Sequence, residues 1–207
     1  NDKKRATPGW GMRQGPFLAD LKAAGVTPEQ VDFVLCTHLH VDHVGWNTRL
    51  VNGRWEPTFP NARYVFNRRE YEHWSQSADP EQAETFRDSV QPILEANRAV
   101  LVEGEHEITA GIRLEPTPGH TPGHCSVHLA AGGPEAVITG DMMHHPLQII
   151  QPERCSRFAW DPALTRATRR AFLERYADRD VRIVGTHFAA PTHGLVVGHQ
   201  DAFRLKV

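Results

Sequence analysis

Short apolar runs alternate with polar or amphipathic stretches along most of the chain. The pattern predicts a helix from Pro16 to Ala24, ended by Gly25, and a mostly apolar strand over residues 31–36. Between them, Thr27-Pro28-Glu29-Gln30 has the residues of a helix N-terminus with a capping box. The strand ends directly at a group of histidines, which makes this point of the chain the first candidate for chemistry.

The rest of the chain continues the alternation. Residues 49–61, which contain Gly53, Pro57 and Pro60, are predicted to form a polar loop. Further helices are predicted at residues 68–75, 80–98 with a break near Pro92, and 162–176. Further strands are predicted at residues 62–66, in short pieces between 99 and 114, and at 126–129, 136–139 and 181–185. This order predicts a layered α/β or α+β domain whose loops after the strands carry the polar residues.

Composition narrows the possible functions. A chain of 207 residues with no shift in composition is expected to form a single domain over residues 1–207. A net charge of -2 gives no electrostatic reason to expect a nucleic-acid partner, and no apolar run approaches the ~18 residues that would span a bilayer. The three cysteines (Cys36, Cys125 and Cys155) form no CxxC pair, and Cys36 and Cys125 are expected to be small buried hydrophobes.

The chain opens with Asn1-Asp2-Lys3-Lys4-Arg5 and has no initiator methionine. This opening does not have the apolar centre of a signal peptide. We therefore expect a cytoplasmic protein whose N-terminal part is incomplete. The alternative that a targeting signal was removed stays open.

The segment Thr37–His43 contains four possible metal ligands directly after the predicted strand. His38 and His40 are two residues apart in a loop, so both imidazoles can point the same way, and Asp42 and His43 can aim at a second point nearby. Neutral imidazole and carboxylate are ligands that zinc-like ions prefer. The alternative is a surface loop that is rich in histidine by chance, and the density of ligands argues against it.

Three later residues supply what this segment lacks. His120 lies in a Gly/Pro turn, and Asp141 and His187 each end a predicted strand. A lone histidine after a strand is usually structural, but all three occur in addition to the first segment. Together they give seven ligands, enough for two metal ions if one carboxylate bridges.

Four motifs carry a family resemblance: HLHVDH at 38–43, TPGHTPGH at 117–124, TGD at 139–141 and GTH at 185–187. They resemble the metallo-β-lactamase superfamily, and the similarity covers nearly the whole stretch from residue 31 to residue 187. It implies a four-layer αβ/βα sandwich with the metals at one edge between two sheets. Family members have strands before the first motif, and this chain has little room for them, so the N-terminal strands are missing or the first half is short.

The resemblance also implies roles for the ligands. His38, His40 and His120 would hold one divalent ion, and zinc is the expected metal. Asp42, His43 and His187 would hold the second ion, with Asp141 bridging the pair.

Within the superfamily, several branches fit poorly. The bridging Asp141 argues against the commoner zinc β-lactamases, the neutral charge argues against nucleases, and iron-binding redox members usually have a flavin domain or a sulfur-substrate partner. The segments 45–48, 55–60 and 142–146 look most like quorum-quenching N-acyl homoserine lactonases and methyl-parathion-hydrolase-like enzymes.

We therefore expect hydrolysis of an ester or lactone bond in a small molecule by a hydroxide that bridges the two metals. A phosphotriesterase is the alternative within the branch, and a diiron redox protein on the same ligands is the alternative of another class. Asp42 could also accept a proton, and His145 could protonate the leaving group, although a structural role for His145 is equally open. The expected partner is a small-molecule substrate, without nucleic acid or membrane, and a homodimer stays open.

The remaining histidines and aromatic residues are assigned weaker roles. His124 and His128 are expected to support the ligands or lie on the surface, and His193 is expected in a loop. Trp46, Phe158 and Trp160 are candidates for the pocket wall, with core packing as the alternative.

Overall fold

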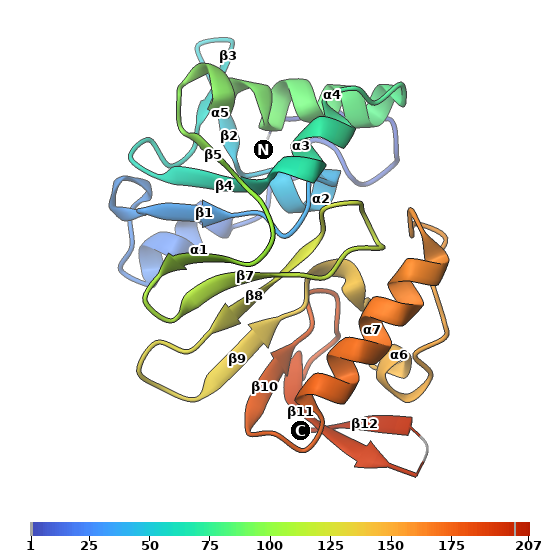
Figure 1. Ribbon diagram of the computed structural model, residues 1–207. Coiled ribbons are helices and arrows are strands. Elements are labelled where there is room, and N and C mark those ends of the chain that lie inside the picture. Colours follow the sequence, from blue (N-terminus) through green and yellow to red (C-terminus); the bar gives the residue numbers. More distant parts are fainter. Residues whose placement is uncertain (1, 201) are drawn as a thin grey trace. The chain divides into compact units, whose positions relative to one another are not determined.

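The computed structural model describes residues 2–200 and 202–207 (Figure 1). Its contacts divide the chain into two compact units, the first ending at Val102 and the second beginning at Glu103. Each unit has its own β-structure and its own helices, so the expected mixed α/β class is confirmed. The prediction that residues 1–207 act as one domain stays a prediction.

The first unit contains a three-stranded sheet in the order β1 (Phe33–Leu35), β4 (Arg63–Asn67), β5 (Ala99–Val102). Both pairings are parallel, which requires a crossover between β4 and β5. This crossover contains three helices: α3 (Arg68–Trp74), α4 (Pro80–Ser89) and α5 (Gln91–Glu95). The central strand β4 is buried at all but its first residue, as expected for a strand covered on both faces.

Local signals place the other helices of this unit. Helix α1 (Phe17–Ala23) and the 3-10 helix η1 (Pro28–Gln30) occur where predicted, and η1 has the predicted capping box. The long predicted helix is broken at Val90, and Pro92 lies in the first turn of α5, where its missing N–H costs nothing. In the described residues before β1 there is no strand, in agreement with the short space that the sequence leaves there.

The predicted polar loop at residues 49–61 was wrong in its first half. Strands β2 (Thr48–Val51) and β3 (Arg54–Pro57) form an antiparallel hairpin there. Its turn is Asn52-Gly53, and both residues have positive φ, at 50° and 80°. Asn-Gly is the strongest short signal for a hairpin turn of this kind, and the charged, half-exposed strands around it concealed the signal.

The second unit is built on a seven-stranded sheet in the order β12-β11-β10-β9-β8-β7-β6. Only the β9–β10 pairing is parallel, and the crossover between them contains α6 (Leu147–Ile150) and α7 (Pro162–Tyr176). In Figure 1, α7 (orange) lies alongside this sheet, and its buried residues share a core cluster with the central strands. The strands are β6 (His106–Thr109), β7 (Ile112–Pro116), β8 (Cys125–Leu129), β9 (Glu135–Ile138), β10 (Val181–Val184), β11 (His193–His199) and β12 (Ala202–Lys206).

The sequence analysis missed the last two strands, and His193 opens β11 where a loop was predicted. The strand contains Gly194 and Gly198, and glycine weakens a strand pattern. At Gly194 a Cβ atom would lie 2.5 Å from the carbonyl oxygen of Lys206 in β12. The glycine is therefore required by the close approach of the neighbouring strand, which the sequence alone does not reveal.

Among the described residues, no helix has the length and apolar character needed to cross a membrane. Cys36 and Cys125 are buried as predicted, and none of the three cysteines is in a disulfide.

Candidate metal centre

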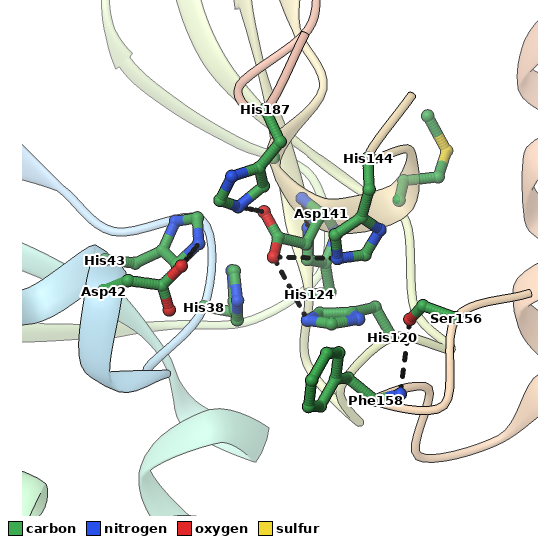
Figure 2. A network of polar contacts seen from close by, with 12 residues as sticks. His38, Asp42, His43, His120, His124, Asp141, His144, Ser156, Phe158 and His187 are labelled. Atoms are coloured by element: carbon green, nitrogen blue, oxygen red, sulfur yellow. Dashed lines mark hydrogen bonds and ion pairs between the residues drawn. The ribbon is translucent and has the colours of Figure 1, made fainter. Parts of the chain in front are cut away.

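The first ligand segment leaves β1 as a short loop and then forms the helix α2 (Val41–Val44), with His40 as its N-cap residue. The ring centroids of His38 and His40 are 4.8 Å apart, and those of His38 and His43 are 4.0 Å apart. His43 Nε2 lies 3.4 Å from Asp42 Oδ2 (Figure 2). The structure thus brings the four ligands predicted from this segment together within the first unit.

A buried carboxylate holds the backbone of this segment. Glu70 in α3 is fully buried, and its Oε2 accepts hydrogen bonds from the Leu39 N–H at 3.1 Å and from Trp74 Nε1 at 2.7 Å. Leu39 separates His38 from His40, so this contact fixes the backbone between two candidate ligands. Sequence analysis missed Glu70 because it lies in an otherwise polar helix, where nothing local marks it as buried.

The second cluster is assembled around Asp141 in the second unit. Asp141 lies in the 3-10 helix η2 (Gly140–Met142) after β9. Its Oδ2 lies 3.5 Å from His120 Nε2 and its Oδ1 lies 3.2 Å from His187 Nε2 (Figure 2). His120 comes from the turn between β7 and β8, and His187 follows β10. The two carboxylate oxygens therefore face two different histidines.

His144 also faces this carboxylate, and the sequence analysis did not select it. His144 Nε2 lies 3.2 Å from Asp141 Oδ2, and its ring stacks on that of His187 with centroids 5.4 Å apart. The donor atoms of His120, Asp141 and His144 lie within 4.8 Å of one another. The helix η2 ends at Met142 and Met143 is extended, so no helical spacing links His144 to Asp141 in the sequence.

His145, the predicted proton donor, has a different environment. It is exposed, and its Nδ1 accepts a hydrogen bond from the Leu147 N–H at 3.0 Å, at the first turn of α6. This contact gives His145 a structural function in the α6 turn. The proposed catalytic role of His145 stays a prediction.

The side chain of His124 holds the backbone of Asp141. The Asp141 N–H donates to His124 Nε2 at 2.9 Å, so Nε2 is the acceptor and Nδ1 carries the proton. His124 Nδ1 lies 3.1 Å from the carbonyl oxygen of Thr117, to which it donates. His128 is buried in β8, where its Nε2 lies 3.4 Å from Glu135 Oε2.

The turn that carries His120 is tied to the start of α7. Gly119 has φ of 132°, and a Cβ atom there would lie 2.5 Å from the Thr165 backbone nitrogen, so only glycine allows this approach. The carbonyl oxygen of His120 accepts a hydrogen bond from the Trp160 N–H at 2.9 Å. Phe158 and Trp160 are 52% and 53% exposed, so neither is part of the core.

Each cluster has the donor chemistry of a divalent metal site. The first offers three imidazoles and a carboxylate, and the second offers the same set once His144 is counted. Imidazole and carboxylate suit zinc and similar ions, and none of these side chains supplies a thiolate. The residues therefore fit divalent metal ions.

Comparisons with known proteins agree with this chemistry. The family model described as the metallo-beta-lactamase superfamily matches residues 8–193. An N-acyl homoserine lactonase from a Bacillus species is 34% identical over 107 residues, which are 52% of this chain and 36% of the relative. The matched part is thus little more than a third of that relative's length.

Solved structures show the same fold. A structure described as the hydrolase AbOPH in the beta lactamase superfamily is 28% identical, with a TM-score of 0.81, and the match covers 98% of this chain and 73% of the other. The dizinc quorum-quenching lactonase AidC, solved with a product, has a TM-score of 0.80 at 22% identity, covering 94% and 70%. The expected fold is confirmed, and the chain belongs to the metallo-beta-lactamase superfamily.

Proposed function

We propose that this chain is a metal-dependent hydrolase that opens lactone or ester bonds in small molecules, with an N-acyl homoserine lactone as the favoured substrate type. The observation that carries the proposal is the pair of His/Asp clusters, one in each unit, in a chain of this superfamily. The relatives with lactonase names give the substrate class. Because the match covers only part of those relatives, the activity stays a proposal.

In this proposal the two clusters act as one site for two divalent ions, zinc being the favoured metal. The ligands of the first ion are His38, His40 and His120. The ligands of the second are Asp42, His43 and His187. Asp141 serves both ions, which is consistent with its two oxygens facing different histidines.

The chain's own groups then have distinct tasks. Bound divalent ions would supply Lewis acidity. They would also lower the pKa of water, so that hydroxide is available near neutral pH to attack a carbonyl carbon. Asp42 is partly exposed and can accept a proton as the tetrahedral centre forms. The leaving alkoxide needs a proton, and the candidates are His145, from the sequence, and His144, from its contact with Asp141.

The reaction is tested with a panel of substrates and one purified sample. We expect turnover of N-acyl homoserine lactones and of simple aryl esters, with little turnover of an aryl phosphotriester. A preference for the phosphotriester would replace the lactonase proposal by the phosphotriesterase alternative. Iron in the sample, together with oxygen consumption, would favour the diiron redox alternative. No turnover of any ester, lactone or phosphotriester by the metal-loaded protein would refute the hydrolase proposal.

A further inference from the structure

Arg169 in α7 is 1% exposed, although its guanidinium carries a charge. Nε and Nη2 donate to the carbonyl oxygen of Met142 at 2.9 and 2.8 Å. Nη1 donates to the carbonyl oxygens of Pro152 and Arg154 at 2.7 and 2.6 Å. Burying a charged group is unfavourable unless its hydrogen-bonding capacity is used. These contacts therefore stabilise the buried guanidinium and fix its position.

The doubly bound carbonyl belongs to the turn that carries the ligand cluster of the second unit. Met142 directly follows Asp141 and comes two residues before His144. The Asp141 N–H is fixed by His124, and the Met142 carbonyl is fixed by Arg169. The backbone is thus held on both sides of the Asp141 side chain.

Gln148 adds a third attachment. Its Oε1 accepts from the His144 N–H at 2.6 Å, and its Nε2 donates to the carbonyl oxygen of Arg154 at 2.9 Å. That carbonyl is also bound by Arg169, so the two side chains belong to one hydrogen-bond network. Gln148 is 7% exposed, which protects this network from water.

We propose that Arg169, with Gln148, is a positioning residue that holds the turn carrying Asp141 and His144 and thereby sets the geometry of Asp141 for metal binding. The inference rests on the proposed function, because it assumes that Asp141 is a ligand. Groups that orient metal ligands through hydrogen bonds commonly change metal affinity when they are removed. Here the orienting contact reaches the ligand through the peptide that follows it.

Arg170 provides a matched control on the same helix. Its Nη2 lies 3.1 Å from Glu153 Oε1, and its side chain is 45% exposed. An exposed ion pair of this kind contributes little to stability. Arg170→Met therefore removes the same type of side chain without touching the turn at Asp141.

The experiment compares Arg169→Met, Arg169→Lys, Gln148→Leu and Arg170→Met in the purified chain. Zinc affinity is measured by competition with a chromophoric chelator, ligand geometry by the visible spectrum of bound cobalt, and folding by circular dichroism. We expect Arg169→Met and Gln148→Leu to raise the zinc dissociation constant about 10- to 100-fold and to change the cobalt spectrum. Arg169→Lys keeps the charge and should recover part of the affinity, and Arg170→Met should match the wild type.

Gln148→Leu removes no charge, so it keeps the test valid if Arg169→Met does not fold. A folded variant at either position with wild-type zinc affinity and cobalt spectrum would overturn the inference. Asp141→Ala separates this failure from that of the proposed function. If Asp141→Ala loses metal while the folded Arg169 and Gln148 variants do not, only the positioning role is wrong. If Asp141→Ala keeps wild-type metal affinity, the proposed function itself is wrong.

Discussion

The two candidate ligand clusters are built in different ways. In the first unit, His38, His40, Asp42 and His43 come from one continuous segment after β1. In the second unit, His120, Asp141 and His187 come from three separate connections of one sheet. The first cluster therefore depends mainly on local backbone conformation, and the second depends on how neighbouring strands and α7 are packed.

The supports of the clusters differ accordingly. Glu70 holds the first segment through one backbone N–H, between two ligands. The turn at Asp141 is held by His124, Gln148 and the buried guanidinium of Arg169. A site assembled from separate segments depends on such contacts, because each segment can otherwise move independently.

The largest effect should come from Asp141→Ala. Its two carboxylate oxygens face different histidines, so its loss should weaken both proposed metal positions. We expect lactone turnover to fall by about three orders of magnitude or more, and most bound metal to be lost. Elemental analysis and kinetics on the same samples check this, with the exposed residue Asp180→Ala as the control. Retained metal would show that the second cluster is not the shared element of the site.

Asp42→Asn should have the next largest effect, and on rate more than on metal content. The change keeps the shape of the side chain and removes its charge, so the proposed proton acceptor is lost. We expect turnover to fall by about two orders of magnitude or more, while the ion at His38, His40 and His120 stays bound. A variant with full metal and near wild-type turnover would show that the chemistry does not need Asp42.

A smaller effect on activity should show which of His144 and His145 protonates the leaving group. If one of them protonates the leaving group, its alanine variant should lose more activity on an alkyl lactone than on a nitrophenyl ester, whose leaving group needs no acid. We expect His144→Ala to lose about tenfold or more on the lactone, and His145→Ala to keep its metal and lose less. An equal loss on both substrates would remove that histidine from the acid role.

The smallest effect concerns the alkaline stability of the first unit. Burial raises the pKa of the Cys36 thiol from 9.0 to about 12 and that of the Tyr64 hydroxyl from 10.0 to about 12. The folded state therefore keeps protons that the unfolded state releases, so stability is fully present below pH 9 and falls as pH rises towards 12. Each group lowers the free energy of unfolding by at most about 1.4 kcal/mol per pH unit.

Burial acts in the opposite direction on Lys3, lowering its pKa from 10.5 to about 8. The unfolded state then binds more protons between these values, so Lys3 adds stability as pH rises through that window. Chemical denaturation from pH 7 to 11 should show a shallower alkaline loss in Cys36→Ala than in the wild type. Cys155→Ala, in the other unit, serves as the control. If the free energy of unfolding falls equally steeply with pH in both variants, Cys36 does not contribute to the alkaline loss.

The difference between the clusters also explains what the sequence could predict. The first cluster was recognisable because its candidate ligands lie close together in the sequence and follow an apolar strand. The helices α4 and α7 were marked by proline in the first turn. His144 was not predicted because it lies beyond the end of η2, after the extended residue Met143, where no local spacing relates it to Asp141.

Other features depend on contacts between distant segments. Glu70 and Arg169 are charged residues in polar helices, and their burial follows from packing that no local pattern reveals. The strand β11 was missed because its Gly194 is explained only by the approach of Lys206 in β12. Charge, spacing and caps are local properties, whereas burial of a charged group is a tertiary one.

A metal titration tests most directly whether the two clusters together hold two catalytic ions, as proposed. Metal-free protein would be titrated with zinc while bound zinc and lactone turnover are followed in the same samples. The proposal predicts tight binding of two zinc ions per chain, with full turnover only when the second is bound. Saturation at one ion per chain, or full turnover without any divalent metal, would contradict it.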